Sequence, residues 1–343
     1  MGLEEVQSLT LAQAVARYDR MPVALRPATL HPRYVATDAV RNPVLQPLYL
    51  CFETQGECWM HSLHRTVVPG ASVSDASSPY GYGGPLSSID DRSFLDAAWR
   101  AYTAWMREQR VAVEYVRFHP MLHNERFYGG HVADNRQVVW MDLSDGEITA
   151  RYAARLRQTV KKAAAAGLVY EECALGPHAR AFAAYHRAAM REMQADAFYI
   201  FDDDYFERLA ATGLAWLGVC RRAGSAPAEW LAACLFLDGQ GLREYHLAAT
   251  HEQGRKAGAS SFALHQAALA ARGRGIPRLY LGGGTDAAEG NPLLFFKSGY
   301  SPHRLIYRTG WNVFDAAAYD GLKERFAGEW AAHPERPIFY RKV

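Results

Sequence analysis

A lysine that follows two phenylalanines near the C-terminal end of the chain has the type and spacing to supply chemistry. Lys297 comes after Phe295 and Phe296, and a glycine-rich stretch, residues 281–284 (LGGG), precedes the run. A cation held beside apolar bulk can stabilise negative charge that develops in a transition state. The alternative interpretation is a surface lysine that follows a buried pair of phenylalanines.

Two predicted elements position this lysine. Residues 278–281 (RLYL) have strand propensity and end at glycines, whose missing Cβ atoms allow a ligand to approach the backbone closely. After a short spacer, Asn291 fits an N-cap, Pro292 the first helical position and Gly299 the left-handed position after the end. The sequence therefore predicts a strand, a loop suited to function and a two-turn helix over 292–298.

The composition is that of an ordinary globular protein. Of 343 residues, 49% are hydrophobic and 22% charged, and the formal net charge is +2. A net charge this small does not by itself indicate nucleic-acid binding, although a local basic patch could still bind nucleic acid. The length predicts two domains. The N-terminal residues include acids where a secretory signal would have bases, and no apolar run reaches the length of a membrane span. We therefore expect a cytoplasmic protein that has no membrane span.

No metal site is expected. The acidic run 202–204 (DDD) is explained by a capping box, because Glu207 follows Asp204 by three residues. His119 and His123 have the spacing of ligands on a helix, but Pro120 makes a continuous helix there unfavourable. The cysteines are odd in number and lack zinc or disulfide spacing, which fits a reducing compartment. They are Cys51, Cys58, Cys173, Cys220 and Cys234.

Periodicity and turn residues predict a mixed α/β (α+β) chain. Strands 48–53 and 58–68 form a hairpin through Gln55 and Gly56. The other predicted strands are 111–118, 138–143, 214–220, 229–237, 242–249, 278–281 and 338–340. The predicted helices are 3–20, 94–109, 148–166, 182–193, 261–272, 292–298 and 319–326.

Two further segments have residues suited to binding. Tyr80 and Tyr82 lie among glycines and prolines, where they can present hydroxyls and rings to a ligand or turn inward as structural residues. The helix 148–166 carries Arg155, Arg157, Lys161 and other bases. These form either a solvated face or a basic strip for phosphate or RNA.

The order of elements in the second half resembles the core of the GNAT acyltransferase fold. Arg255, Gly258 and Ser260 resemble its Arg/Gln-x-x-Gly-x-Gly/Ala pyrophosphate loop, with serine in the last position. Backbone amides at a helix N-terminus can receive phosphate oxygens.

The wider resemblance is to the FemAB/FemX family of non-ribosomal peptidyl transferases, which is similar to two GNAT-like domains in tandem. The segments that carry it lie in family order: 79–85 (PYGYGGP), 117–120 (RFHP), 141–144 (MDLS), the basic helix 155–167, 190–191 (MR), 198–201 (FYIF), 205–206 (YF), 244–250 (EYHLAAT), 281–284 (LGGG) and 294–300 (LFFKSGY). The resemblance implies two GNAT-like domains, each a mixed, largely antiparallel sheet flanked by helices. We expect 1–146 as the first, with 315–343 packing back on it, and 147–314 as the second, with the catalytic elements.

The resemblance also implies amide formation between an aminoacyl group delivered on transfer RNA and an amine acceptor, either a nucleotide-sugar peptide of peptidoglycan synthesis or a small aminated metabolite. It makes Lys297 the oxyanion stabiliser, with Phe296 beside it. The expected substrate contacts are Tyr80, Tyr82, Arg191, Tyr199, Tyr245, His246, Gly283 and Gly284. The expected contacts with donor phosphate or transfer RNA are Arg255, Gly258, Ser260, Arg155, Arg157 and Lys161.

Two other functions stay open. One is an acyl-CoA-dependent N-acyltransferase that uses the Arg255 loop, and the other is a GNAT-like pair that only binds a ligand or partner. No tightly bound cofactor is expected. Asp286, Glu289 and His246 are candidates for the general base by position only. The sequence leaves open the transferred group, the acceptor and the oligomeric state.

Overall fold

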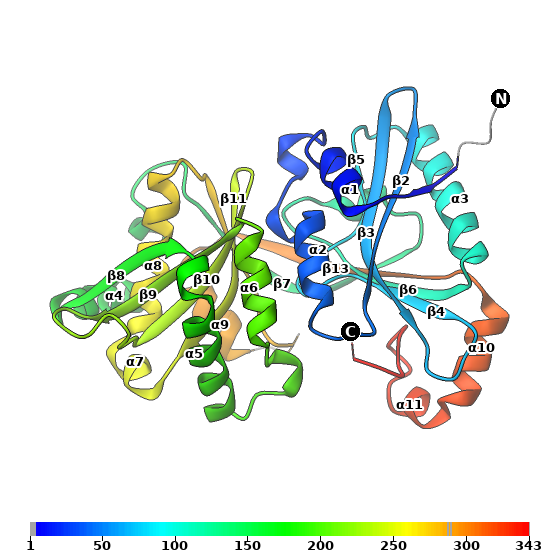
Figure 1. Cartoon of the computed structure of the whole chain (residues 1–343). Coiled ribbons are helices and arrows are strands. Elements are labelled where there is room, and N and C mark those ends of the chain that lie inside the picture. The colour runs from blue at the N-terminus through cyan, green and yellow to red at the C-terminus, as the bar shows by residue number, and fades with distance from the viewer. Residues whose placement is uncertain (1–4, 287, 289, 343) are drawn as a thin grey trace. The chain divides into compact units, whose positions relative to one another are not determined.

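The chain divides into two units, and two long strands run from one unit into the other. The structure, a computed structural model, describes residues 5–286, 288 and 290–342 (Figure 1). Unit 1 comprises Met1–Asn135 and Tyr307–Val343, and unit 2 comprises Arg136–Ile306. The boundaries differ from the expected 146/147 and 314/315 because they fall inside β7 (His131–Asp142) and β13 (Arg304–Val313), which each contribute residues to both units.

Unit 1 has a mixed sheet with helices packed against it. Its strands are β1 (Gln7–Ser8), β2 (Gln46–Thr54), β3 (Glu57–Val67), β4 (Ser74–Ser77), β5 (Leu86–Ser87) and β6 (Val111–Arg117). Its helices are α1 (Leu11–Tyr18), α2 (Pro32–Ala39), α3 (Arg92–Glu108), α10 (Ala316–Arg325) and α11 (Ala327–Ala332). The strand order is β1-β2-β3-β4-β6-β13, with β5 beside β3. All these pairs are antiparallel except β4 with β6.

The predicted hairpin of unit 1 is confirmed. β2 and β3 pair in register from Gln46 opposite Arg65 to Thr54 opposite Glu57. Gln55 and Gly56 both have positive φ, 53° and 86°, as a two-residue hairpin turn requires.

Unit 2 has the same type of sheet. Its strands are β8 (Leu168–Ala174), β9 (Ala215–Arg222), β10 (Ala232–Gly239), β11 (Leu242–Thr250) and β12 (Arg278–Gly283), in the order β7-β12-β11-β10-β9-β8. Its helices are α4 (Ala154–Ala165), α5 (Ala179–Glu192), α6 (Asp203–Ala211), α7 (Glu252–Ala257), α8 (Ala259–Gly273) and α9 (Pro292–Ser298). The pairs are antiparallel except β11 with β12. The predicted mixed α/β class, with largely antiparallel strands flanked by helices, is confirmed, but the described strands belong to one 13-stranded sheet instead of two.

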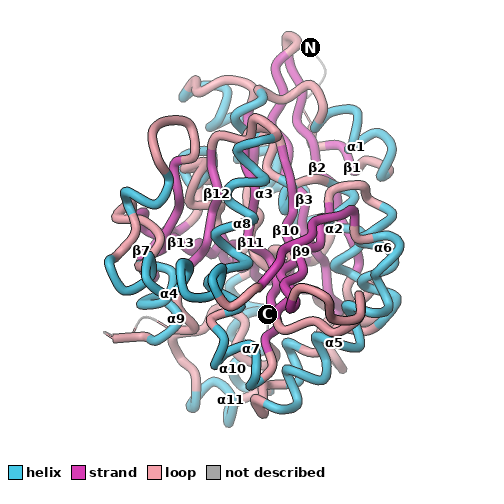
Figure 2. Tube along the Cα trace, turned by 90° about the vertical axis from the view of Figure 1, so that its left-hand side faces the viewer, coloured by secondary structure: helices cyan, strands magenta, loops and turns pink. Residues whose placement is uncertain are grey.

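Helices cover both faces of the unit 2 sheet. Residues 232–237 of β10 are all buried, so this strand has no solvent face. Ala232, Cys234 and Phe236 pack in one cluster with residues of α4 and α8. Figures 1 and 2 show α5 and α6 on the opposite face. Within the described part of the chain, no helix has both the length and the apolar character that a membrane crossing needs.

Several predicted boundaries are wrong for local reasons. The first helix begins only at Leu11, because Thr10 and Gln13 form a capping box there. The predicted box of Asp204 and Glu207 does not form, because the N-cap of α6 is Asp202, two residues earlier, and the helix begins at Asp203. Asp204 instead pairs with Arg208 one turn on, at 2.9 Å.

Two predictions near the C-terminus are also wrong. Residues 338–340 form no strand; Ile338 and Phe339 are buried instead in a cluster with Tyr319 and Leu322 of α10. Gly299 is right-handed, with φ −64° and ψ −23°, so α9 does not end in a left-handed glycine.

A buried ion network ties the strands of unit 2 together. Arg243, at the start of β11, is 0% exposed, and its guanidinium donates to Glu172 of β8 (both contacts 2.8 Å) and to Asp238 of β10 (2.7 and 2.9 Å). Arg274, after α8, reaches the same two carboxylates at 2.8 Å. Two cations therefore balance two anions, as burial of charge requires.

Replacement of Arg243 by methionine should destabilise the protein by about 3–5 kcal/mol, because two carboxylates would lose their main buried partner. Urea unfolding measures this loss. The matched control is Arg208→Met, which removes an exposed pair from the same unit and should change stability by about 0.5 kcal/mol or less. Equal, small effects of both substitutions would show that the network does not hold the sheet.

Candidate functional site

The structure places Lys297 in a buried position at the end of β12. Its side chain is enclosed, with the residue 8% exposed, and Nζ donates to the carbonyl oxygen of Gly283 at 2.7 Å. Burial lowers the pKa of the Lys297 ammonium from its ordinary 10.5 to about 7. The described residues include no carboxylate that forms an ion pair with it. The surface-lysine interpretation is therefore wrong, and at neutral pH the amine is divided between its charged and neutral forms.

The helix that carries Lys297 begins as predicted. The Asn291 side chain accepts from the amides of Leu293 and Leu294, and Pro292 occupies the first turn. Asn291 also donates to the side chains of Thr285 (2.8 Å) and Asp286 (3.0 Å). One residue thus caps α9 and ties it to the described part of the preceding loop.

The two glycines at the end of β12 are required by close packing. A Cβ on Gly283 would lie 2.8 Å from the Gln137 carbonyl oxygen, and one on Gly284 would lie 2.5 Å from the Asn291 side chain. The predicted function of these glycines was to admit a ligand to the backbone. The structure shows a different reason for them, the approach of β7 and α9, and their role in substrate binding stays a prediction.

The two phenylalanines beside Lys297 differ in exposure. Phe295 is 68% exposed, whereas Phe296 is half-buried and its ring meets Tyr300 edge-on at 5.5 Å. The burial of the three residues is therefore the reverse of what their types predict, because the lysine is buried and one phenylalanine faces solvent.

Strands β11 and β12 pair over only a short distance before the candidate site. Their parallel register comprises Arg243 with Leu279 and Glu244 with Tyr280, although β11 continues to Thr250 and β12 to Gly283. The register of β10 with β11 shifts here, so that His246 is the extra residue of a β-bulge. Bulges of this kind are common beside active sites, where they redirect a side chain.

The candidates for a general base have different surroundings. The Ala288 amide and the Asn291 side chain hold the pKa of the Asp286 carboxyl below its usual range, which makes Asp286 a weak base. The His246 ring shares a hydrogen bond of 2.8 Å with the Tyr205 hydroxyl. Glu289 lies outside the described residues.

The segment that resembles a pyrophosphate loop consists of the short helix α7 and the turn at Gly258 that joins it to α8. The Arg255 guanidinium donates to the Thr250 carbonyl (2.8 Å), and the Ser260 hydroxyl shares a hydrogen bond of 2.7 Å with that of Thr250. Gly258 is left-handed, with φ 70°, and joins α7 to α8, whose N-terminus has no side-chain cap. Arg255 also forms an ion pair with Glu192 at 2.6 Å.

The basic helix α4 lies against this turn. A Cβ on Gly258 would lie 2.8 Å from the Thr159 side chain of α4. Leu156, Val160 and Ala163 are buried, so the helix packs through one face. The predicted donor contacts Arg155, Arg157 and Lys161 are exposed. Arg157 also donates to the Tyr152 carbonyl. The basic helix α4 and the turn at Gly258, which are the two segments predicted to bind the donor, therefore lie next to each other.

The predicted substrate contacts of the two units have different surroundings. Arg191 and Tyr199 are exposed in unit 2, at the end of α5 and shortly after it. Tyr245 packs against Phe236 at 5.6 Å, within the core of the unit. In unit 1, the Tyr82 ring contacts His119 and Tyr307, and the Tyr80 ring lies under Arg41. The role of each in binding stays a prediction.

One cluster of potential metal ligands was missed by the sequence analysis. Among the described residues, only Cys51, Glu53 and Cys58 bring three such groups within 4.8 Å of one another. The signal that could have found it is the hairpin register, which places these residues on one face. His123 is left-handed, with φ 52°, so it shares no helix with His119.

Comparisons with solved structures identify the fold as that of FemX and of tandem GNAT proteins. The FemX crystal structure has a TM-score of 0.70 and 12% identity over 94% of this chain and 99% of that chain. The C-terminal domain (DUF2156) of a proposed lysylphosphatidylglycerol synthetase from Agrobacterium fabrum has a TM-score of 0.60 and 15% identity over 94% and 98%. A tandem GNAT protein from the clavulanic acid biosynthesis pathway has a TM-score of 0.50 and 13% identity over 90% and 98%. No family model and no curated protein sequence matches.

The low pKa of Lys297 should make its contribution to stability depend on pH. Between pH 7 and 10.5 the unfolded lysine holds a proton that the folded one lacks, so stability should rise with pH over this range. Urea unfolding at pH 7 and pH 9 should show a gain of roughly 2 kcal/mol relative to Lys297→Met, in which other titrations are unchanged. Parallel pH profiles of the two proteins would contradict the lowered pKa.

Proposed function

We propose that this chain, which has the tandem GNAT-like fold of FemX, is an aminoacyltransferase that forms an amide bond. The donor is an aminoacyl-transfer RNA, and the acceptor is an amine on a peptidoglycan precursor or a small metabolite. The observation that carries the proposal is the buried Lys297 at the end of β12, where β11 and β12 have separated.

The chemistry needs a group that stabilises an oxyanion. Attack of an amine on an ester carbonyl produces a tetrahedral intermediate with negative charge on oxygen. The Lys297 ammonium is desolvated and is positioned by α9 and by Gly283, so it can interact with that charge without reorganisation. Such a group contributes about 3–4 kcal/mol, or roughly a hundred- to a thousandfold in rate. No side-chain nucleophile is required.

Transfer RNA is supported as the donor by the position of the basic helix. The bases of α4 are exposed, and Thr159 of the same helix lies against Gly258, so a polyanion bound at the turn can also contact α4. Glu192 partly neutralises Arg255, which leaves the bases of α4 as the stronger attraction for phosphate.

An acyl-CoA donor is the second candidate. The observation in its favour is the uncapped N-terminus of α8 after the left-handed Gly258, which suits a pyrophosphate. The absence of a tightly bound cofactor, the cytoplasmic location and the acceptor stay predictions in either case.

The donor is tested by offering the purified protein charged transfer RNAs and acetyl-CoA in parallel and measuring which acyl group reaches an amine. We expect consumption of aminoacyl-transfer RNA, with binding that weakens steeply between low and physiological salt through counterion release. Combined Arg155→Gln, Arg157→Gln and Lys161→Gln should lower the salt slope, whereas Arg92→Gln, at an exposed site in unit 1, should not. Consumption of acetyl-CoA alone, or donor binding insensitive to salt, would reject transfer RNA.

Lys297→Met should reduce turnover by at least about tenfold while donor binding and folding persist, because the cap and the packing of Phe296 are unchanged. Lys323→Met, in unit 1, is the control.

In the wild type, kcat/KM should fall as pH rises above about 7, because Lys297 loses the proton that makes it a cation. A rate that rises through this pH would instead make the neutral amine the active form, and near-normal turnover of Lys297→Met would exclude it from the mechanism.

A further inference from the structure

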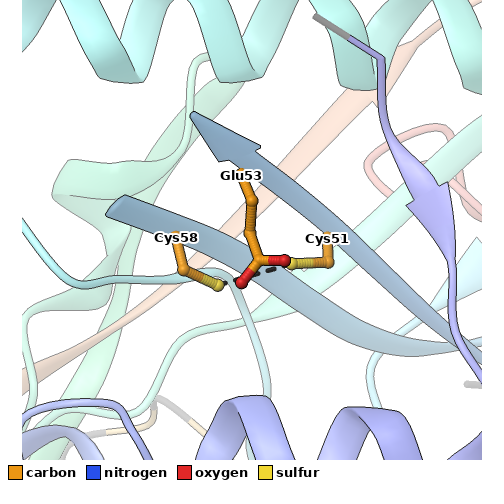
Figure 3. Close-up of side chains that lie close together, drawn as sticks. All are labelled: Cys51, Glu53 and Cys58. Carbon is orange, nitrogen blue, oxygen red and sulfur yellow. Dashed lines mark hydrogen bonds between the residues drawn. The ribbon is translucent and has the colours of Figure 1, made fainter. Parts of the chain in front are cut away.

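Two cysteines of unit 1 lie in contact on the hairpin of β2 and β3. Figure 3 shows Cys51 and Glu53 on one strand and Cys58 on the next, with their side chains turned toward one another. We propose that Cys51 and Cys58 are a reversible dithiol, a modification site that hydroperoxides convert to an intramolecular disulfide.

The hairpin holds the two sulfurs close together. Cys51 pairs with Met60 and Glu53 with Cys58, so the cysteines are diagonal neighbours on one face of the sheet. Their Sγ atoms are 3.4 Å apart and share a hydrogen bond. A disulfide needs about 2.05 Å, so the sulfurs must approach by little more than an ångström. Both cysteines lie within a few residues of the turn at Gln55 and Gly56, the end of the hairpin where such a shift disturbs the fewest strand pairs.

The surroundings favour a thiolate at Cys51. The hydrogen bond shared with Cys58 lowers the pKa of the Cys51 thiol, and Arg17 acts in the same direction, whereas burial and the Glu53 carboxylate oppose them. The same contact and burial raise the pKa of the Cys58 thiol, so that Cys58 keeps its proton more readily than Cys51. This division provides one nucleophilic sulfur and one resolving thiol, as a redox-sensitive pair needs.

The cluster adjoins side chains that are partly exposed. Cys51 is 1% and Cys58 8% exposed, but the side chains of Arg17 and Glu53 beside them are 26% and 28% exposed. In unit 2, Cys220 and Cys234 lie inside the core, where burial raises the pKa of each thiol to about 12, and the partly exposed Cys173 also has a pKa raised by burial.

The same residues are less suited to a metal ion. Both oxygens of Glu53 are already paired, with Arg17 at 2.8 Å and with Arg20 at 2.7 Å. Two guanidinium groups at this distance oppose a bound cation, whereas they favour an anionic sulfur. The charges around the cluster therefore select thiolate chemistry over metal ligation.

The reaction balances with a hydroperoxide as the oxidant. The Cys51 thiolate attacks one peroxide oxygen, the O–O bond breaks, and water or an alcohol leaves after protonation, which produces a sulfenic acid at Cys51. The Cys58 sulfur then attacks the Cys51 sulfur; the S–S bond forms and hydroxide leaves with the Cys58 proton as water. The two sulfurs together lose two electrons, which the peroxide gains.

Treatment of the reduced, folded protein with hydrogen peroxide tests this. The number of thiols that can be titrated in denaturant should fall by two from the initial five, peptide mapping should find Cys51 linked to Cys58, and dithiothreitol should reverse both changes. Cys51→Ser and Cys58→Ser should each abolish the linked peptide. Cys173→Ser removes the partly exposed cysteine of unit 2 and should leave the linkage unchanged.

The effect of the Arg17 charge is tested by measuring how fast the linkage between Cys51 and Cys58 forms. Arg17→Gln should slow formation of the linkage by at least about threefold, since the thiolate fraction of Cys51 falls, whereas Arg92→Gln should not. Peroxide that oxidises Cys173 first, or that yields no linked peptide in the wild type, would overturn the proposal. So would stoichiometric binding of Cd²⁺ or Zn²⁺ that requires both cysteines and prevents their oxidation, since that result identifies a metal site.

Discussion

The buried ion network around Arg243 is the constraint on which the geometry of unit 2 depends. It joins β11 to β8 through Glu172 and to β10 through Asp238, and it lies at the start of β11, where that strand pairs with β12. A fully buried guanidinium is tolerable only if its charge and its donors are satisfied, so these strands are held in one arrangement at this end. Beyond this end β11 and β12 no longer pair, and there the bulge at His246 and the carbonyl of Gly283 lie.

Lys297 shows that the fold accepts an unfavourable local arrangement at the candidate site. A lysine with one carbonyl partner and a pKa near 7 is less stable in its charged form than it would be in water. The neighbouring Phe295 places an apolar ring in water, which is also unfavourable. Exchanges of this kind, with a polar group inside and an apolar group outside, are expected where function and stability have different requirements. This pattern supports a chemical role for the element more strongly than the sequence motif does.

Much of the fold could be predicted because local chemistry determines it. Asn291 and Pro292 start α9 through contacts within the helix itself. Gln55 and Gly56 form a two-residue hairpin turn because both adopt the positive φ that such a turn requires. The errors occurred where packing competes with local preference. Residues 338–340 have strand composition, but in the fold they pack against α10 and find no sheet edge. The unit boundaries also differ, because β7 and β13 are each long enough to serve both units.

By itself the sequence determined many of the elements, their order and the type of residue at each candidate position, since these follow from periodicity, caps and turns within a few residues, but it did not predict α2, β4 or β8. Only the tertiary structure decided the state of those residues, because burial, pKa and proximity depend on segments distant in the chain. It placed the Lys297 amine on the carbonyl of Gly283 and the basic helix α4 against Gly258. The contact of Cys51 with Cys58 at 3.4 Å is an intermediate case, because the predicted hairpin makes the two neighbours in the chain and its register then sets them side by side.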